Sequence, residues 1–320
     1  MKPMRLFVML SLAIAVSALG LRADSFEEID KHALKAPAAA EQDVETLASY
    51  LCKPCRDDKE RARAIFRWVT SRVSYDVSGY LKGEYGDLSA SGVLKSRSAV
   101  CSGYANLFQE LSKQAGLEPV TIQGYGKGIG YSPGQSIQGP TNHSWNAVKI
   151  EDYYYLVDCC WGAGYINGQS FIQKFVPFYF LTSPKDFIYS HFPEDESWQL
   201  LENPVSKTEF EQLPFLKPGF FNAGLGLTSN ISAVIQTDSQ LNLAFSAPDD
   251  ALLLANLLQN DRNLDENLVS VQKSSGMFKI HARFPGPGSY ILRLFAKRKA
   301  DKGMYEWAAE FKIEARGSQE

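Results

Sequence analysis

The sequence predicts an α+β domain followed by a small all-β sandwich. Patterns typical of amphipathic helices dominate the first third of the chain, and a segment rich in aromatic and β-branched residues, 143–161, predicts paired strands. After about residue 227, short strand-like runs alternate with polar turns, as in a β-sandwich. We therefore expect a mixed domain over 24–226 and a sandwich over 227–320, in agreement with the two domains expected for 320 residues.

The composition is that of an ordinary globular protein. Apolar residues make up 45% and charged residues 22% of the chain, proportions that exclude a disordered polar polymer. The formal net charge is -3 and no long run of lysine or arginine occurs, so the charge pattern does not indicate binding to nucleic acid.

Residues 1–23 have the pattern of a secretory signal peptide. Lys2 and Arg5 precede a short apolar run, and small residues follow up to Gly20 and Ala23. We expect export to the periplasm or the medium, with no membrane span left after cleavage. An uncleaved anchor is the alternative, although the apolar run is short for a transmembrane helix.

The five cysteines are informative because exported proteins meet oxidising conditions. Cys52 and Cys55 form a C-x-x-C pair without a second pair at zinc-finger spacing, which favours a local disulfide over a metal site. Cys159 and Cys160 lie in an apolar run and are expected in a strand. The odd count leaves at least one free thiol, and Cys101 is the candidate.

A helix is predicted to begin close to Cys101. Ser98 is the expected N-cap, Gly116 is the expected left-handed residue after the helix, and apolar residues recur between them at helical spacing: Tyr104, Leu107, Phe108 and Leu111. The positive end of a helix dipole favours a thiolate at Cys101 and hence a nucleophile near neutral pH. A buried apolar cysteine is the alternative.

A glycine-rich segment follows a predicted strand at 120–124. Glycines occur at 124, 126, 128, 130, 134 and 139, but the Gly-Lys-Ser/Thr ending of a phosphate-binding loop is missing. A long flexible loop between two candidate catalytic elements is better suited to form the wall of a cleft. We expect no cofactor, and no acidic loop has the spacing of a calcium site.

Residues 143–150 and 153–161 predict a β-hairpin with Glu151 and Asp152 as its turn. A two-residue turn pairs Ile150 with Tyr153 and brings His143 and Asp158 to one face of the sheet, about 5 to 8 Å apart at the backbone. A longer loop is possible because Glu-Asp is not a favoured turn pair, and an odd-length loop would separate the two side chains.

Three residue types required for acyl transfer occur in compatible places. Cys101 would supply the thiolate, His143 the base, and Asp158 the acid that orients the imidazole. A core histidine bonded to a strand neighbour is the structural alternative for His143.

Four segments resemble the transglutaminase-like superfamily, in particular its kyphoscoliosis-peptidase-like branch: RARAIFRW (61–68), AVCSGYA (99–105), HSWNAV (143–148) and LVDCCWGAG (156–164). That branch continues with a segment similar to 191–195 and with an immunoglobulin-like domain. The resemblance implies a papain-like α+β core with a catalytic triad at Cys101, His143 and Asp158, and an immunoglobulin-like fold for the sandwich.

These observations predict an exported cysteine-dependent enzyme that acts on amide bonds of proteins or peptides, by hydrolysis rather than by crosslinking. Tyr104, Trp145 and Trp161 are the candidates for substrate contact, and no metal ligand is assigned. The alternative is a non-catalytic adhesion or assembly module that binds through the sandwich and the aromatic-rich surface around Tyr125, Tyr131 and Trp161.

Overall fold

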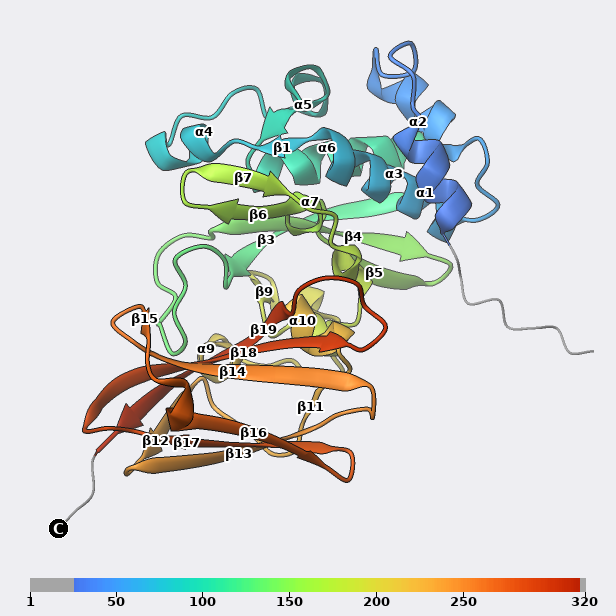
Figure 1. Ribbon diagram of the computed structural model, residues 1–320. Helices are drawn as coiled ribbons and strands as arrows, with labels where there is room; N and C mark the ends of the chain where they lie inside the picture. Colours follow the sequence, from blue (N-terminus) through green and yellow to red (C-terminus); the bar gives the residue numbers. More distant parts are fainter. Residues whose placement is uncertain (1–25, 317–320) are drawn as a thin grey trace, which may run out of the picture.

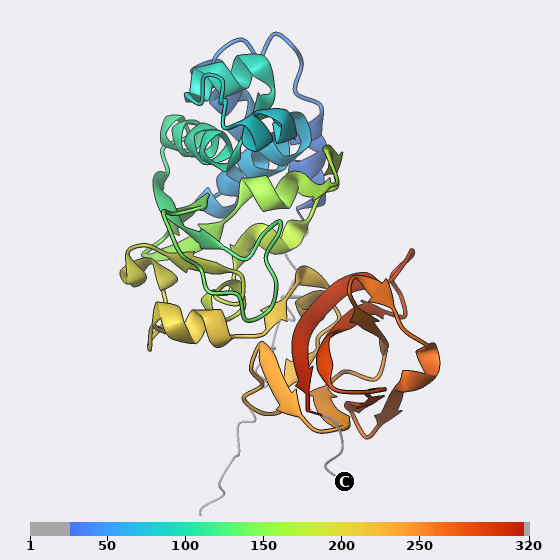
Figure 2. The ribbon, with the colours of Figure 1, turned by 90° about the vertical axis from the view of Figure 1, so that its left-hand side faces the viewer.

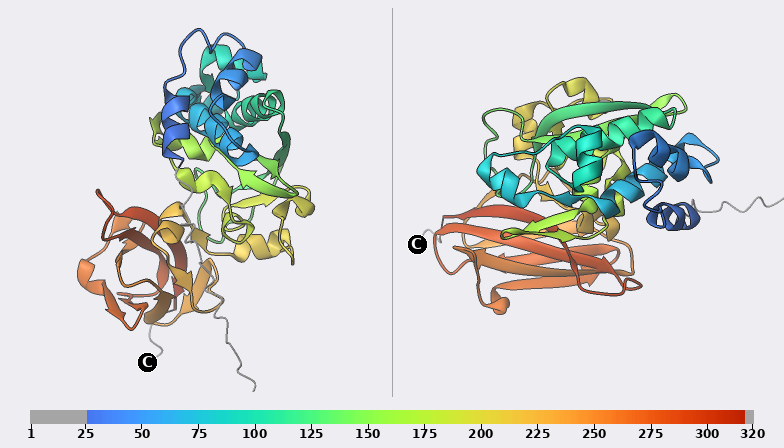
Figure 3. Two further views of the ribbon diagram at one scale, coloured as in Figure 1. Left: turned by 90° about the vertical axis from the view of Figure 1, so that its right-hand side faces the viewer. Right: turned by 90° about the horizontal axis from the view of Figure 1, so that it is seen from above.

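The computed structural model describes residues 26–316, which form a mixed α/β domain and a β-sandwich (Figure 1). The predicted signal peptide, residues 1–23, lies outside the described residues. Both predicted architectures, the α+β domain and the sandwich that follows it, are confirmed. Two further views show the N-terminal helices on the side of the first domain that faces away from the sandwich (Figure 3).

Helices make up the N-terminal part of the first domain. The predicted patterns at 25–35 and 41–51 and the helix beginning at Asp57 are confirmed, each within a few residues. The helices and short 3-10 turns of this domain are α1 (Glu27–Leu34), α2 (Val44–Cys52), α3 (Asp58–Arg72), α4 (Val77–Lys82), α5 (Ala90–Ser96), α6 (Cys101–Gln114), α7 (Cys159–Ala163), η1 (Pro177–Tyr179), α8 (Pro184–Phe187), η2 (Glu196–Gln199) and α9 (Lys207–Gln212).

A five-stranded antiparallel sheet supports these helices, in the order β8-β5-β4-β3-β9. Helix α6 packs on strands β3 and β4, and the apolar stripe predicted for it is buried. The strands of the sheet are β3 (Glu118–Gly126), β4 (His143–Ile150), β5 (Tyr153–Val157), β8 (Phe180–Thr182) and β9 (His191–Pro193). Two small pairs complete the domain, namely β1 (Ser74–Tyr75) with β2 (Ser98–Ala99), and β6 (Gly164–Asn167) with β7 (Ser170–Gln173).

The predicted hairpin register is confirmed, because Ile150 pairs with Tyr153 across the turn. Glu151 adopts a positive φ of 55°, which allows the tight connection despite its unfavourable residue type. The predicted length of the second strand was wrong. Strand β5 ends at Val157, and Cys159 and Cys160 lie in the short helix α7 rather than in a strand.

The ring of Phe66 on α3 lies against the backbone of α7. A Cβ added to Gly162 would lie 2.6 Å from Phe66 Cζ, so the two helices can approach this closely only because residue 162 is glycine. Phe66 is fully buried at this contact. The end of strand β5 and the start of α7 are thereby fixed against the helical layer.

Two sheets form the second domain, and Figure 2 shows their strands curved around a common core. One sheet has the order β10-β19-β18-β14-β15, with β12 paired in parallel to β19, and the other has the order β11-β13-β17-β16. The elements are β10 (Phe215–Leu216), α10 (Pro218–Asn222), β11 (Gly226–Leu227), β12 (Val234–Thr237), β13 (Gln240–Ser246), β14 (Ala251–Gln259), β15 (Arg262–Asn263), η3 (Glu266–Leu268), β16 (Val269–Ser274), β17 (Met277–Arg283), β18 (Gly288–Arg298) and β19 (Glu306–Ala315).

The domain boundary after residue 226 stays a prediction. Strand β10 already pairs with β19 of the sandwich, and the apolar core of the sandwich begins with Leu216. Lys174 of the first domain forms an ion pair of 2.8 Å with Glu306 of the second. Residues 215–216, which the prediction places in the first domain, therefore already pair with a strand of the sandwich.

The predicted disulfide between Cys52 and Cys55 is not formed, and all five cysteines are free thiols. Cys55 Sγ instead donates a hydrogen bond of 3.6 Å to the carbonyl oxygen of Leu51 on α2. Within residues 26–316, no helix is both long enough and apolar enough to span a bilayer.

Candidate active site

Cys101 is the first residue of helix α6 and is partly exposed. Val100 precedes it as the N-cap residue, and no side chain caps the helix. The predicted cap, Ser98, was wrong because that residue belongs to strand β2, where it pairs with Ser74. The predicted position of Cys101 at the positive end of the helix dipole is confirmed.

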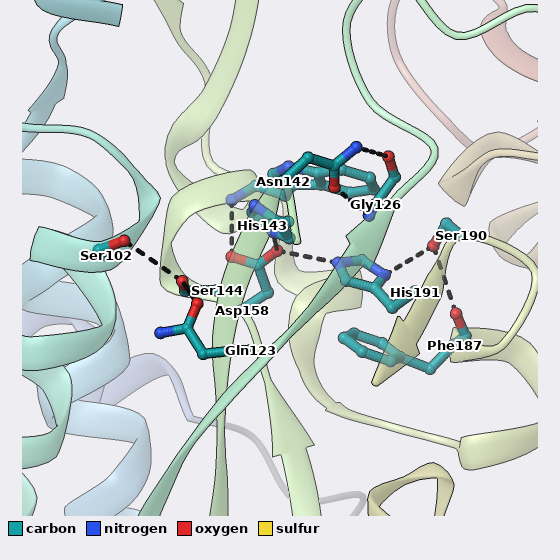
Figure 4. Close-up of polar contacts among 11 residues, drawn as sticks. Ser102, Gln123, Gly126, Asn142, His143, Ser144, Asp158, Phe187, Ser190 and His191 are labelled. Atoms are coloured by element: carbon teal, nitrogen blue, oxygen red, sulfur yellow. Dashed lines mark hydrogen bonds and ion pairs between the residues drawn. The ribbon is translucent and has the colours of Figure 1, made fainter. Parts of the chain in front are cut away.

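His143 is the first residue of strand β4, and its side chain lies next to Asp158, the residue before helix α7. The Nε2 atom of His143 lies 2.7 Å from Oδ2 of Asp158 (Figure 4). Asp158 is the N-cap of α7, and its other oxygen, Oδ1, accepts a hydrogen bond of 3.0 Å from the Trp161 backbone N–H. The predicted proximity of His143 and Asp158 is thus found, although a helix cap rather than a strand carries the aspartate.

The three side chains form an electrostatically coupled set. Burial raises the pKa of the Cys101 thiol, but the hydrogen bond and charge of His143 and the Ser144 backbone N–H outweigh this, so the pKa is lowered overall. Burial would also lower the pKa of His143, yet the charge and hydrogen bond of Asp158 raise it to about 10. Because Nε2 is bonded to Asp158, Nδ1 is the nitrogen left for the sulfur. A thiolate paired with an imidazolium is the expected state near neutral pH.

A second imidazole, that of His191, was not assigned a role from the sequence. Its Nε2 lies 3.0 Å from the same Asp158 Oδ2 that holds His143. Burial favours the neutral acid of Asp158, but the charges and hydrogen bonds of the two histidines hold its pKa well below the usual range. His191 lies on the three-residue strand β9, 33 positions from Asp158, so no periodicity or spacing rule connects the two residues.

His143, Asp158 and His191 also offer three donor atoms within 4.8 Å of one another, a spacing that suits a metal ion. Both imidazoles, however, already direct Nε2 at one carboxylate oxygen at hydrogen-bonding distance. A metal would have to displace both of these bonds and their protons. We assign a hydrogen-bonded cluster here and no metal.

The glycine-rich loop between β3 and β4 passes over Trp161. A Cβ added to Gly126 or Gly128 would lie 3.1 or 3.2 Å from Trp161 Cζ2, so the glycines permit this close approach. Asn142 fixes the start of the loop by bonding through Oδ1 to the Gly126 N–H at 2.7 Å. A Cβ on Gly126 would also lie 3.2 Å from His143 Cβ, so the loop begins beside His143; its role as the wall of a cleft stays a prediction.

The same loop is fastened to helix α9 by a buried lysine. Lys127 is 0% exposed, and its Nζ donates hydrogen bonds of 2.7 and 2.9 Å to the carbonyl oxygens of Phe210 and Leu213. Glu211 of α9 accepts a hydrogen bond of 2.8 Å from the Ile137 N–H farther along the loop. Strand β10 of the sandwich follows α9 after two residues. Helix α9 therefore contacts the loop through these hydrogen bonds and is joined by the chain to the second domain.

Of the three predicted substrate-contacting residues, only Trp161 is accessible. Its half-buried ring lies 4.9 Å from the ring of His143 and 4.3 Å from that of His191, centroid to centroid. Tyr104 and Trp145 are each 1% exposed, and the Tyr104 hydroxyl donates to the Val73 carbonyl at 2.7 Å. Their assignment as substrate contacts is corrected, since both side chains belong to the core.

The second domain also approaches Trp161. Lys217 Nζ lies 5.7 Å from the Trp161 ring centroid, 4.0 Å from that of Phe215 and 5.0 Å from that of Trp307 on β19. Burial lowers the pKa of Lys217 to about 8, against the opposing charge of Glu310. A lysine of the connecting segment thus lies between the sandwich and the aromatic wall of the site.

Two family models match this chain. One describes the transglutaminase-like superfamily and covers residues 45–159, which include Cys101, His143 and Asp158. The other describes a KY-like, immunoglobulin-like domain and covers residues 207–320.

Curated proteins that are similar to this chain come from several animals. Human kyphoscoliosis peptidase is 31% identical over 292 residues, which are 90% of this chain and 43% of that protein. Hillarin of Drosophila melanogaster is 30% identical over 318 residues, covering 88% of this chain and 38% of hillarin. The Lim and transglutaminase domain protein ltd-1 of Caenorhabditis elegans is 28% identical over 306 residues, covering 85% and 41%. The chain thus spans less than half the length of each of these relatives.

Proposed function

Because this chain is a two-domain protein of the transglutaminase-like superfamily, with a KY-like immunoglobulin-like domain, we propose that it is a cysteine-dependent acyl-transfer enzyme. Its substrates would be amide bonds of proteins or peptides. The observation that carries this proposal is the contact of 2.7 Å between His143 and Asp158, with the Cys101 thiol acidified by the same imidazole.

Each side chain has one role in the proposed reaction. The Cys101 thiolate attacks the amide carbonyl carbon, and the Cys101 backbone N–H is one donor to the oxyanion that forms. His143 protonates the leaving amine as the C–N bond breaks, which leaves an acyl thioester on Cys101. His143 then takes a proton from water, whose oxygen attacks the thioester. The C–S bond breaks, which releases a carboxylic acid and restores the Cys101 thiolate beside the His143 imidazolium. Asp158 keeps the imidazole oriented throughout.

Hydrolysis is the favoured outcome over crosslinking. Water is always available to the acyl-enzyme, whereas no group among the described residues is identified as the binding site of a second, amine substrate. Incubation with a peptide mixture in ¹⁸O-labelled water tests this choice by mass spectrometry. Hydrolysis adds one labelled oxygen to each new carboxylate, and crosslinking instead yields joined peptides without the label.

Alkylation of Cys101 by iodoacetamide tests the triad before any substrate is known. We expect labelling well below the ordinary pKa of a thiol, and a fall of at least about tenfold near pH 6 in His143→Ala. His281→Ala, on the sandwich, is the matched control and should react like the wild type. If wild-type Cys101 reacts no faster than a model thiol and His143→Ala changes nothing, the non-catalytic binding module becomes the better hypothesis.

Export is a separate part of the proposal and is supported by the N-terminal sequence pattern. Expression of the full chain with a C-terminal tag, followed by cell fractionation and N-terminal sequencing, tests it. We expect the exported form to begin directly after Gly20 or Ala23. Retention of the intact N-terminus inside the cell would contradict export and leave the enzyme proposal unaffected.

A further inference from the structure

The carboxylate of Asp158 is held by two imidazoles, of which the proposed reaction uses one. His143 and His191 both direct Nε2 at Oδ2, at 2.7 and 3.0 Å. The distance between the ring centroids of the two histidines is 5.3 Å, so they do not bond to each other and meet only at the carboxylate.

The Asp158 carboxylate fixes the tautomer of His191, and a serine is the partner on the far side of the ring. Ser190 Oγ lies 2.8 Å from Nδ1 of His191. A neutral imidazole that faces an ionised carboxylate with Nε2 must carry its proton there, because a bare nitrogen would repel the anion. Nδ1 then accepts the single hydroxyl hydrogen of Ser190 at 2.8 Å, in preference to the Phe187 carbonyl oxygen, which lies 3.4 Å from the same Oγ. Figure 4 shows this chain from Ser190 through His191 to Asp158.

Aromatic rings enclose His191 and keep it neutral. Its ring is stacked on Phe187 at 3.8 Å, and the rings of Trp161 and Trp145 follow at 4.3 and 5.1 Å. Burial lowers the pKa of His191 to about 4, and the charges of His143 and Lys217 act in the same direction against the opposing effect of Asp158.

The titratable groups that face His191 come from four elements. They are Asp158 at the start of α7, His143 on β4, Lys217 before α10 and Tyr179 in η1. Burial raises the pKa of Tyr179, which stays a neutral phenol. Asp158 therefore receives one charged donor, His143, and one neutral donor, His191.

We propose that His191 is a positioning residue, whose Nε2–H holds the Asp158 carboxylate ionised and turned toward His143. This inference rests on the proposed triad and adds to it. With Oδ1 bonded to the Trp161 N–H and Oδ2 to two imidazoles, the carboxylate cannot rotate without breaking several hydrogen bonds. Removal of the His191 donor leaves the Asp158 carboxylate less firmly oriented toward His143. The His143 imidazolium then stabilises the Cys101 thiolate less well.

Two substitutions separate the hydrogen bond from the packing of the ring. His191→Phe keeps an aromatic ring in the enclosure but removes the donor, whereas His191→Gln keeps an N–H near the position of Nε2. For His191→Phe we expect the acid limb of the Cys101 alkylation profile to move up by roughly one pH unit, which is about tenfold slower labelling along that limb. His191→Gln should recover most of this loss, and His281→Phe should match the wild type.

Several outcomes would overturn the inference. A His191→Phe profile that superimposes on the wild type excludes a positioning role, and equal losses in the Phe and Gln variants assign the effect to packing. Failure of the proposed function looks different, because wild-type Cys101 would then react like a model thiol whatever residue 191 is.

Imidazole ¹⁵N NMR of the wild-type protein tests the same claim without any variant that could fail to fold. We expect His191 to stay neutral, with its proton on Nε2, down to about pH 5. Protonation near the ordinary pKa of histidine, or a proton on Nδ1, would contradict the inference.

Discussion

Oδ2 of Asp158 lies 2.7 Å from Nε2 of His143, while Oδ1 of the same carboxylate caps helix α7. One side chain thereby ends a strand, begins a helix and orients the proposed base. The helix cap fixes the direction of the carboxylate independently of His143, so the geometry exists before any substrate binds.

Asp158→Asn should preserve much of this geometry and remove its charge. An amide oxygen can still cap α7, but it no longer favours the imidazolium, so the pKa of His143 falls and that of Cys101 rises. We expect alkylation near pH 6 to slow by about 10- to 100-fold. Asp195→Asn, which alters the exposed cap of η2, is the control and should leave the rate unchanged. An unchanged rate in Asp158→Asn would mean that the charge of the carboxylate does not influence the pKa of the Cys101 thiol.

Gly162→Ala should destabilise the first domain. The added methyl would lie 2.6 Å from Phe66 Cζ, and the buried phenyl ring can give way only by disturbing its neighbours. We expect a loss of about 1 to 3 kcal/mol, seen as a lower Tm in circular dichroism. Gly86→Ala is the matched control because a Cβ there meets nothing within 4 Å. Equal Tm values for the two variants would show that the α3–α7 contact is looser than described.

Arg63→Lys tests the packing of α3 against α1. Arg63 is 7% exposed, and its guanidinium bonds to both Asp30 oxygens at 2.7 and 2.8 Å and lies over the ring of Phe26. Lysine cannot reproduce a two-point contact that also stacks on rings, so we expect a loss of about 1 to 3 kcal/mol in urea unfolding. Arg61→Lys, at a surface pair with Asp58, should change stability by less than about 0.5 kcal/mol. A similar effect of both changes would argue against the buried pair.

Much of the fold follows from local patterns that the sequence displays directly. The stripe of α6, the hairpin pairing of Ile150 with Tyr153 and the strands of the sandwich each depend on neighbours in the chain. The predictable part of the approach of His143 to Asp158 is this register, which brings the end of β5 beside β4. These features were predictable because short-range geometry determines them. Asp158 itself follows the last residue of β5 and is placed by its role as the cap of α7.

The remaining features of the site depend on contacts between distant segments. The strand prediction for Cys159 and Cys160 failed because the Asp158 side chain caps the chain into α7, an effect that residue types alone do not distinguish from a continuing strand. His191 reaches Asp158 only because β9 pairs with β3, and a three-residue strand containing proline gives almost no periodic signal. The burial of Tyr104 and Trp145 is likewise decided by how α6 packs on the sheet.

The buried amine of Lys127 should make stability depend on pH. Its Nζ bonds to two carbonyl oxygens at the end of α9, and burial lowers its pKa from 10.5 to about 7. Between these two values the unfolded chain binds more protons than the folded chain, so folding becomes more favourable as the pH rises. Below about pH 7 the folded protein carries a buried ammonium and its stability is reduced by the full cost of burying that charge. Above the ordinary lysine pKa of 10.5 the amine is neutral in both states and this cost is absent.

Lys127→Met removes the titrating group and keeps an apolar side chain of similar length. The unfolding free energy of the wild type minus that of Lys127→Met should therefore rise with pH from about 7 to 10, by on the order of 3 kcal/mol. Urea unfolding at several pH values, followed by tryptophan fluorescence, measures this difference. Lys149→Met is the matched control, because its Nζ pairs with Glu118 at 3.2 Å near the surface, and its difference from the wild type should stay flat. A flat difference for Lys127→Met as well would mean that the two carbonyls keep the buried ammonium charged throughout this range.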